Sequence, residues 1–286
     1  MKSIAIAVEL TDPELAELRA LLEQRSGVIF EGKLADEFVG RARQHMEASR
    51  FFNGVELLRA LRNSNSEYEK LLARLLGYEP AFFRYPEMYR ALADEVLPEI
   101  RGRKFWDNPR TLRIWNAGCG SGDEPYSVAL AIMDSLDAKE PWAVSILATD
   151  INRQALLHAD RGVYPHSALQ VLTPRQLETY FARVGDQFLV KPSIRRMVSF
   201  AAANVTQDQS MEPVDVIFCL DVLRYLPQGE RATALQRFYS HLRLGGYLFL
   251  GPADSGADLP AGFESLDGNG RTLYRRLQSN VSDRLA

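Results

Sequence analysis

A glycine-rich segment carries the residue types best suited to hold a ligand. It reads Asn116-Ala117-Gly118-Cys119-Gly120-Ser121-Gly122, and it joins an apolar run to a stretch with helical spacing. Glycines between a strand and a helix let the backbone approach a ligand closely, at the sheet edge where open α/β folds bind nucleotides and nucleosides. The Gly-x-Gly-x-Gly pattern alone also fits a tight turn that binds nothing.

Two acidic residues directly after this turn restrict the ligand. Asp123 and Glu124 begin the predicted helix, where a dinucleotide would place its pyrophosphate. Carboxylates there repel phosphate, which disfavours NAD. S-adenosylmethionine has a sulfonium and an ammonium cation and no phosphate, so these acids are compatible with it. They would equally complement the dipole of the helix.

Polar residues also follow the second and third apolar runs. Asp150 ends Leu147-Ala148-Thr149-Asp150, and a carboxylate at that edge can accept hydrogen bonds from both ribose hydroxyls. Its alternative role is the N-cap of a helix over Ile151–Ala159. Asn204 follows the third run, where its amide can bond an adenine edge or simply stabilise a turn.

The elements that must position these residues are short apolar runs separated by helical stretches. Near-continuous runs of this kind predict a parallel sheet buried on both faces, hence an α/β domain. The Asp267-Gly268-Asn269-Gly270 segment between two strand-like stretches predicts a hairpin and an antiparallel end to the sheet. The five runs are Leu112–Ala117, Ala143–Ala148, Met197–Ala201, Val214–Cys219 and Tyr247–Leu250.

Three segments are predicted along the chain. Residues 1–77 form a helical domain, because leucines recur at intervals of three and four residues. Its first helix begins at Thr11-Asp12-Pro13-Glu14. Residues 78–110 form a linker and a lead-in helix over Glu87–Ile100. Residues 111–286 form the binding domain, and a small β-subdomain at about 164–198, with a strand near Gln187–Val190, explains the long interval before the third run.

Composition excludes several classes of function. The 286 residues are 46% hydrophobic and 25% charged, which is typical of a folded globular protein. A net charge of −3 gives no basic field for nucleic acid. The two cysteines predict neither a disulfide scaffold nor a zinc site, and no metal site is expected at His158 or His166. No apolar stretch predicts a leader or membrane insertion, so a cytoplasmic location is expected.

In their order, these motifs resemble those of the CheR-type chemoreceptor glutamate O-methyltransferases. The resemblance covers almost the whole chain. Its blocks include Phe82-Phe83-Arg84, Ile114 through Ser127, Ala148-Thr149-Asp150-Ile151, Gly162-Val163-Tyr164, Asp215 through Cys219, and Gly245 through Gly251.

The resemblance implies both the architecture and the chemistry. It implies an N-terminal all-helical domain and a Rossmann-like, S-adenosylmethionine-binding methyltransferase domain with a small inserted β-subdomain. The reaction would convert glutamate side chains of a chemoreceptor coiled coil into methyl esters and release S-adenosylhomocysteine, in chemotaxis-type signalling. A glutamate with a pKa of about 4.3 is already ionised at neutral pH, so no general base is needed.

The resemblance also assigns roles to individual residues. Arg84, in the Phe-Phe-Arg motif, and Tyr225 are implied next to the reacting groups. A linker arginine and a packing tyrosine are their ordinary alternatives. The implied cofactor contacts are Arg84, Ala117, Gly118, Cys119, Glu124, Asp150, Asn204, Val205, Asp221 and Val222.

One block departs from the family pattern. Members usually read Cys-Arg-Asn-Val where this chain reads Cys219-Leu220-Asp221-Val222. One cation is lost and one anion gained, which should weaken the attraction for a glutamate side chain. Two alternatives therefore stay open, a methyltransferase with a different acceptor and a catalytically impaired cofactor-binding module.

Receptor contacts are predicted in the helical domain. Arg41, Arg43, His45 and Arg50 place positive charge on one predicted helix, where the family uses basic residues against acidic receptor helices. A solvated helix face is the alternative. The loop at 183–187 is shorter than in relatives that tether to a receptor's C-terminal peptide, so no tether is predicted.

Overall fold

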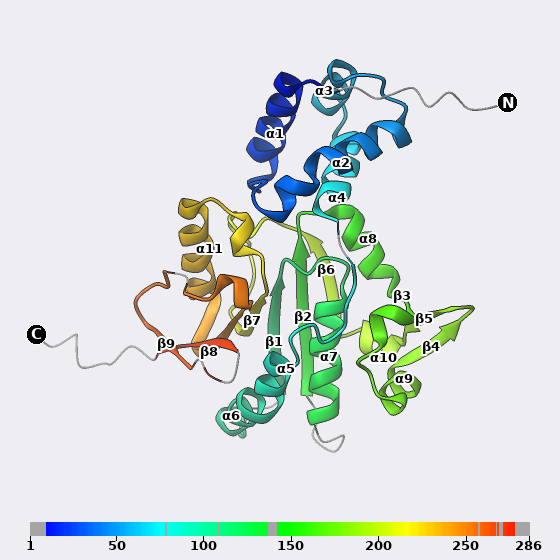
Figure 1. Ribbon diagram of the computed structural model, residues 1–286. Helices are drawn as coiled ribbons and strands as arrows, with labels where there is room; N and C mark the ends of the chain where they lie inside the picture. Colours follow the sequence, from blue (N-terminus) through cyan, green and yellow to red (C-terminus); the bar gives the residue numbers. More distant parts are fainter. Residues whose placement is uncertain are drawn as a thin grey trace, which may run out of the picture. The chain divides into compact units, whose positions relative to one another are not determined.

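The computed structural model describes residues 10–77, 79–107, 109–136, 142–256, 258–266, 268 and 271–277 (Figure 1). The chain divides into two compact units. The first contains the chain before Glu79 together with the short stretches Asn152–Gln154 and Tyr225–Pro227. The second contains Glu79–Ile151, Ala155–Arg224 and the chain from Gln228 onward.

The first unit is helical, as predicted. Its helices are α1 (Asp12–Ser26), α2 (Lys33–Ser49), α3 (Gly54–Asn63) and α4 (Asn65–Leu76). Thr11 caps α1 in a capping box with Glu14, which satisfies amides that the first turn leaves unpaired.

The lead-in helix of the second unit is one continuous rod with an irregular centre. It consists of α5 (Pro86–Ala91), the π-helical turn η1 (Leu92–Val96) and α6 (Leu97–Arg103). The predicted span Glu87–Ile100 is therefore helical and extends to Arg103. The amide of Leu97 bonds the carbonyl of Leu92, one residue further back than in an α-helix, directly before Pro98, which has no amide hydrogen to donate.

The described strands of the second unit form a seven-stranded sheet in the order β6-β2-β1-β7-β8-β10-β9. Strands β6, β2, β1, β7 and β8 are parallel to one another, whereas β10 pairs antiparallel with both β8 and β9. The predicted parallel sheet and its predicted antiparallel end are therefore confirmed. Asp267, Asn269 and Gly270 of the predicted turn lie outside the described residues. The strands are β1 (Arg110–Ala117), β2 (Trp142–Asp150), β6 (Val198–Ala202), β7 (Val214–Cys219), β8 (Leu242–Leu250), β9 (Phe263–Ser265) and β10 (Thr272–Arg276).

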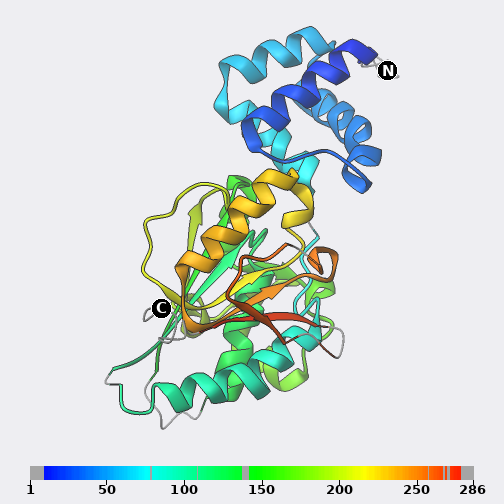
Figure 2. The same cartoon turned by 90° about the vertical axis from the view of Figure 1, so that its left-hand side faces the viewer.

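Helices cover both faces of this sheet (Figures 1 and 2). Helix α11 (Gln228–His241) lies on one face, where its Phe238 packs edge-on against Trp115 of β1 at 5.2 Å between ring centroids. Helices α5 and α7 (Asp123–Ser135) lie on the other, in one core cluster with Ile114 of β1. Ile114 and Trp115 are adjacent in β1 and point to opposite faces of the sheet, because side chains alternate along a strand.

The expectation that every strand is buried on both faces is wrong for β6. Its residues are half-buried or exposed because β6 is the edge strand of the sheet. The predicted β-subdomain is present as an antiparallel sheet of β3 (Val163–Pro165), β5 (Gln187–Val190) and β4 (Phe181–Val184). Its central strand has the predicted bounds. Helix α8 (Arg153–Arg161) precedes it in the chain. Within the described residues, no helix has the length and apolar character that a membrane crossing requires.

Candidate cofactor site

The glycine turn closes against the end of the neighbouring strand. The amides of Gly118 and Cys119 both donate to the carbonyl of Thr149 on β2, at 2.7 and 3.0 Å. Gly118 has a φ of +84°, and a Cβ there would lie 2.3 Å from a methyl carbon of Val222. Glycine is therefore required at this position both for its backbone conformation and for the close approach of Val222.

Asp150 lies at the predicted edge and contacts the glycine turn. Its Oδ2 atom accepts a hydrogen bond from the amide of Gly120 at 2.8 Å. Helix α8 begins at Arg153, so Asp150 does not occupy the position that precedes the helix. The structure thus favours the turn contact over the capping alternative.

Glu124 and Asn116 form a second polar pair beside the turn. The Asn116 amide nitrogen donates to the Glu124 carboxylate. Burial raises the pKa of Glu124 well above its usual range, and the negative charges of Asp123 and Asp221 raise it further. The side-chain oxygen of Asn116 is buried without a hydrogen-bond partner in the described part of the chain. Two oxygen acceptors therefore adjoin the turn, an environment that suits a ligand with hydrogen-bond donors and positive charge. Asn116 was not predicted as a site residue.

Asp123 fixes the Phe-Phe-Arg segment to helix α7. It is 1% exposed, and its carboxylate accepts from the amide of Ala81 and the hydroxyl of Ser121, each at 3.1 Å. The hydroxyl of Ser127 accepts from the amide of Phe83 at 3.0 Å. These bonds place the segment that contains Arg84 over the first turn of α7.

Arg84 is exposed and lies on this segment. Its guanidinium donates to the carbonyl of Glu79 at 2.8 Å. Its positive charge lowers the pKa of Glu124, against the larger effect of burial. Arg84 is therefore within electrostatic range of the acids at the glycine turn.

Asp221 and Tyr85 connect the end of β7 to the same segment. The Tyr85 hydroxyl donates to Asp221 Oδ2, and burial together with this carboxylate raises the pKa of Tyr85 to about 12. Asp254 is buried nearby and accepts hydrogen bonds from the amides of Leu223 and Arg224, at 3.3 and 2.8 Å. Burial raises the pKa of Asp254 to about 6, although those amides oppose the shift.

The surroundings of Leu220 and of three further predicted site residues are as follows. Leu220 is 7% exposed and belongs to the apolar core cluster. Asn204 accepts from the amide and hydroxyl of Thr206, both at 3.0 Å, which is the predicted turn alternative. Val205 is buried. Tyr225 belongs to the first unit, where its carbonyl accepts from the amide of Ile29 at 2.8 Å.

The predicted basic cluster in α2 is only partly at the surface. Arg41 donates to the carbonyl of Leu75 at 2.6 Å and pairs with Glu37, so it joins α2 to α4. His45 is not a surface cation, because it is 2% exposed and burial lowers its pKa. Arg43 on α2 and Arg50, which directly follows α2, are exposed, while Arg41 points about 200° away from Arg43 on the helix.

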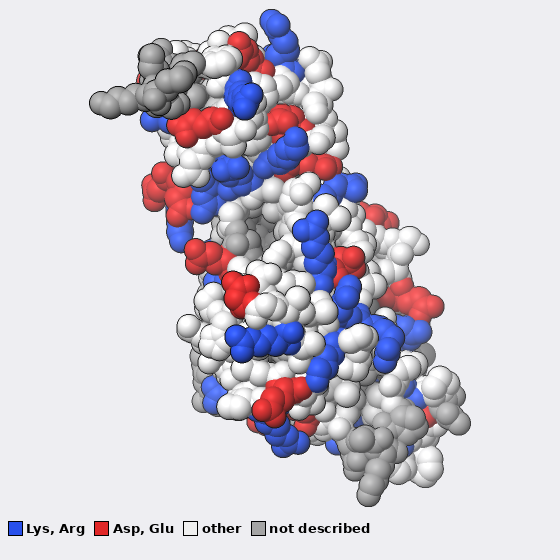
Figure 3. Space-filling view, turned by 90° about the vertical axis from the view of Figure 1, so that its right-hand side faces the viewer, with Lys and Arg blue, Asp and Glu red and all other residues white. Residues whose placement is uncertain are grey.

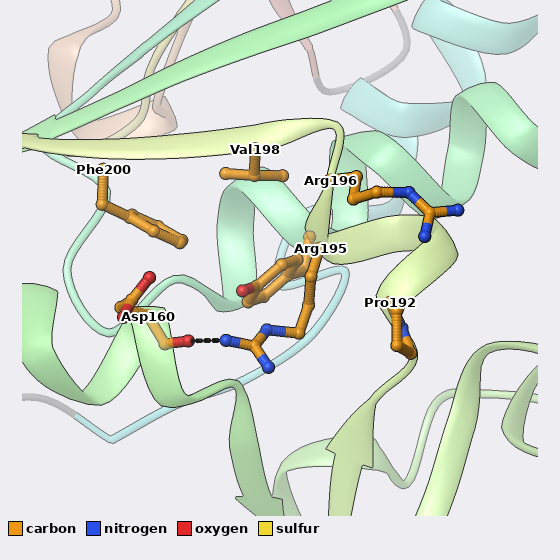
Figure 4. A pocket seen from close by; sticks show the side chains of 7 residues that line it. Asp160, Pro192, Arg195, Arg196, Val198 and Phe200 are labelled. Atoms are coloured by element: carbon orange, nitrogen blue, oxygen red, sulfur yellow. Dashed lines mark hydrogen bonds between the residues drawn. The ribbon is translucent and has the colours of Figure 1, made fainter.

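A separate hollow of about 280 Å³ lies beside the edge strand β6 (Figure 4). Arg195 reaches across it to the carbonyl of Asp160 at 2.6 Å, and Phe200 and Val198 form the opposite wall. None of the predicted cofactor contacts lines it.

Cysteine and metal chemistry find no support in the described residues. Cys119 and Cys219 are buried free thiols, and burial raises the pKa of both well above the usual range. Within the ranges described, no cluster of His, Cys, Asp and Glu side chains has the arrangement of a metal site.

A parallel sheet with a glycine turn after its first strand, and an acid at the end of the adjacent strand, defines the class of α/β proteins that bind a nucleoside cofactor. The family model "CheR methyltransferase, SAM binding domain" matches residues 79–270. The chain belongs to this family of S-adenosylmethionine-dependent methyltransferases, which confirms the resemblance and the predicted cofactor.

Curated relatives match the chain over nearly its full length. A chemotaxis protein methyltransferase of Vibrio parahaemolyticus is 30% identical over 285 residues, covering 94% of this chain and 98% of the relative. Chemotaxis protein methyltransferase 2 of Vibrio cholerae is 29% identical, covering 87% of each chain. Chemotaxis protein methyltransferase 1 of Pseudomonas aeruginosa is 30% identical, covering 90% of this chain and 95% of the relative.

The residues present fit this cofactor. The unpartnered oxygen of Asn116 and the carboxylate of Glu124 suit a cationic group, and the sequence of the glycine turn contains no lysine or arginine to attract a phosphate. The carboxylate of Asp150 at the end of β2 suits a ribose.

Proposed function

We propose that this protein transfers the methyl group of S-adenosylmethionine to glutamate side chains of chemoreceptor-like, methyl-accepting proteins, giving methyl esters and S-adenosylhomocysteine. The observation that carries this proposal is the match to the family's cofactor-binding domain over residues 79–270. The names and nearly complete coverage of the chemotaxis relatives support the choice of acceptor.

Cofactor binding is assigned to the carboxyl edge of the parallel strands. Asp150 holds the ribose, and the backbone of Ala117, Gly118 and Cys119 forms the wall beside it. Glu124, with Asn116, receives the ammonium group. Asn204, Val205, Asp221 and Val222 complete the site around the adenine and the thioether. The cofactor supplies a methyl group activated by its positively charged sulfur.

The acceptor carboxylate needs orientation and not deprotonation. It is ionised at neutral pH, so the chain has to hold it in line and exclude water. Arg84 is the proposed residue for this role, because it is exposed and its long side chain ends in a guanidinium beside the acids of the glycine turn. Its fork-shaped guanidinium matches a carboxylate.

Receptor docking is assigned to the helical domain 1–77, which precedes the linker 78–110 and the methyltransferase domain 111–286. Arg43 of α2 and Arg50, directly after α2, are exposed basic residues that suit an acidic coiled coil. Arg41 supports them from its bonds to Glu37 and Leu75.

The β-subdomain adds a second basic surface. Figure 3 shows Lys and Arg side chains gathered on this side of the second unit. Between residues 155 and 198, six basic residues oppose three acidic ones. We propose that this surface attracts acidic receptors electrostatically and not through a peptide tether. Only Gly185 and Asp186 lie between β4 and β5, which leaves a minimal loop. The basic residues are Arg161, Arg175, Arg183, Lys191, Arg195 and Arg196.

The proposal is tested with methyl-labelled cofactor and membranes from the organism that encodes the chain. We expect label in receptor bands that is released by mild base, because carboxylate methyl esters hydrolyse under those conditions. The Asp150→Ala variant is the matched control and should give no label at the same concentrations. Base-stable label, or label confined to small molecules, would contradict the assigned acceptor.

A different acceptor is the second candidate, and the Asp221 and Asp254 carboxylates favour it. Asp221 contacts Tyr85, the residue after Arg84, and the buried Asp254 lies within electrostatic range of Asp221. Negative charge beside Arg84 repels a carboxylate and tolerates a neutral or cationic acceptor. Calorimetry with S-adenosylmethionine, together with turnover on receptors, separates the possibilities, because tight binding without any turnover would indicate an impaired regulatory module.

A further inference from the structure

A groove rich in arginine lies near the amino ends of the parallel strands, whereas the glycine turn lies at their carboxyl ends. It has a volume of about 650 Å³, and its lining includes Arg103, Lys104, Asp215, Arg243, Leu244 and Arg276. We call it the basal groove. Asp215 and Arg243 lie near the starts of β7 and β8, whereas the cofactor site lies at the carboxyl ends of the parallel strands. The contributing elements α6, α11, β8 and β10 face the viewer in Figure 2.

The acid in the basal groove is already neutralised. Asp215 is 4% exposed, and its Oδ1 atom pairs with the ammonium of Lys104 at 2.6 Å. Its Oδ2 atom accepts from the amide of Arg113 at 2.9 Å. Lys104 also donates to the carbonyl of Thr111 at 2.6 Å. This pair is therefore part of the fold, and the charge of the groove is set by its arginines.

The three arginines have little compensating negative charge. The Arg243 guanidinium lies 3.8 Å from the Asp215 carboxylate, and the Arg103 guanidinium lies 3.9 Å from the Glu99 carboxylate. Arg276 takes part in no ion pair within the described residues. In a chain whose net charge is −3, this local excess of positive charge requires an explanation.

Each guanidinium is held in place by backbone carbonyls. Arg103 donates to Leu244 at 3.4 Å, and Arg243 donates to Pro213 at 3.1 Å. Arg276 donates to Tyr239 at 2.8 Å and stacks on the Tyr239 ring at 4.3 Å. A guanidinium has more N–H donors than these bonds use. The side chains are thus ordered in advance, which reduces the entropy lost when an anion binds.

Exposed aromatic rings adjoin the groove. Phe105 and Trp106 directly follow Lys104 and are 55% and 90% exposed, with their rings in contact at 4.8 Å. The Arg110 guanidinium lies 5.3 Å from the Phe105 ring. An almost fully exposed tryptophan next to a basic surface is typical of a site that meets a ligand or a lipid interface.

We propose that the basal groove binds a phosphate-bearing anion through Arg103, Arg243 and Arg276. Arginine matches phosphate oxygens in a bidentate manner, and no carboxylate of the described residues competes closely for these three side chains. The phosphate comes either from a soluble phosphorylated compound inside the groove or from the headgroups of an anionic membrane that the aromatic pair enters. This site is independent of the methyl acceptor.

The groove is tested with pyrophosphate in a calorimetric titration at low salt. The double variant Arg103→Gln, Arg243→Gln should weaken binding at least about tenfold, because each removes a charge-assisted contact. The control double variant is Arg59→Gln, Arg90→Gln, which changes the net charge equally at two exposed positions outside the groove and outside the basic residues assigned to receptor docking. It should bind like the wild type, and added salt should weaken wild-type binding.

A second arm identifies the source of the phosphate. Co-sedimentation is measured with vesicles of phosphatidylglycerol and phosphatidylcholine, and with phosphatidylcholine alone. Binding to the anionic vesicles that is lost in Trp106→Ser, with pyrophosphate binding retained, identifies lipid headgroups. Pyrophosphate binding without vesicle binding identifies a soluble ligand.

Cofactor calorimetry shows that the variants are folded, because the cofactor site lies at the other edge of the sheet. The proposal is overturned if the wild type binds neither probe. It is also overturned if folded groove variants bind like the wild type, or if the control variant loses binding equally.

Discussion

The hydroxyl of Tyr85 donates a hydrogen bond to the carboxylate of Asp221, and this contact joins the residue after Arg84 to the end of β7. Asp221 has a φ of +60°, in the left-handed region that Asn and Asp tolerate better than other side chains. Its second oxygen accepts from the amide of Ala253 at 3.4 Å. The acid that replaces the usual asparagine is therefore fixed in position.

Replacing this acid should improve the use of a glutamate acceptor. Asp221→Asn keeps an oxygen for Tyr85 and tolerates the same backbone conformation, but it removes the negative charge. We expect the KM for receptor to fall about fivefold with little change in kcat, since a like charge near a solvated site costs about 1 kcal/mol. Methyl-ester formation at varied receptor concentration measures both constants.

Tyr85→Phe is the matched control for this prediction. It removes the hydrogen bond and keeps the carboxylate, so the KM should not fall. If Asp221→Asn leaves the KM for receptor unchanged, then the Asp221 carboxylate does not repel the acceptor, and its role is confined to the proposed cofactor site.

The fold was largely predictable because its signals are local. The apolar runs predicted the parallel strands, and Gly185-Asp186 located the strand at Gln187–Val190. Strand order is not a local property, so the edge position of β6 and its exposure were not predictable. The π-turn at Leu92–Val96 depends on packing around a helix that continues through a proline, and periodicity alone does not reveal it.

The site was predictable where position alone decides it. Asp150 ends a strand next to the glycine turn, and its contact with Gly120 follows from that. The bond from Ala81 to Asp123 was missed because it joins residues 42 positions apart. A charged helix face was the wrong interpretation for His45, because the sequence does not show which side of α2 packs on α4. The sequence also does not show that Leu220 is buried.

Asp150 should dominate the affinity for the cofactor. We expect Asp150→Ala to raise the dissociation constant of S-adenosylhomocysteine about 100-fold, since hydrogen bonds to a charged group contribute about 1.5–3 kcal/mol. Asp150→Asn retains an acceptor for the Gly120 amide, so its affinity for S-adenosylhomocysteine should fall about tenfold. Calorimetry provides these constants. Unchanged affinity in both variants would refute the ribose contact.

Binding of the cofactor should release a proton from Glu124. Burial raises the pKa of this carboxyl, so the free protein retains the proton at a higher pH than an ordinary glutamate does. A cationic ligand favours the ionised form, so affinity should increase as the pH rises. Calorimetry in two buffers of different ionisation enthalpy counts the protons released below pH 7.

Glu124→Gln provides the control for this linkage. It cannot ionise, so both the proton release and this part of the pH dependence should disappear. Proton uptake by the wild type would contradict the predicted direction.

The close contact between Gly118 and Val222 should make the glycine turn sensitive to a single methyl group. Gly118→Ala adds a Cβ at a φ of +84° and 2.3 Å from Val222 Cγ2, and valine is stiff about χ1. Gly185→Ala is the matched control, because Gly185 also has a positive φ, of +63°, but has no atom within 4 Å of the added Cβ. The control should lower the free energy of unfolding by about 1 kcal/mol, from backbone strain alone. Gly118→Ala should lower it by about 2–4 kcal/mol, because overpacking adds to that strain. Urea denaturation of the two variants measures the difference, and equal losses would show that Val222 moves aside freely.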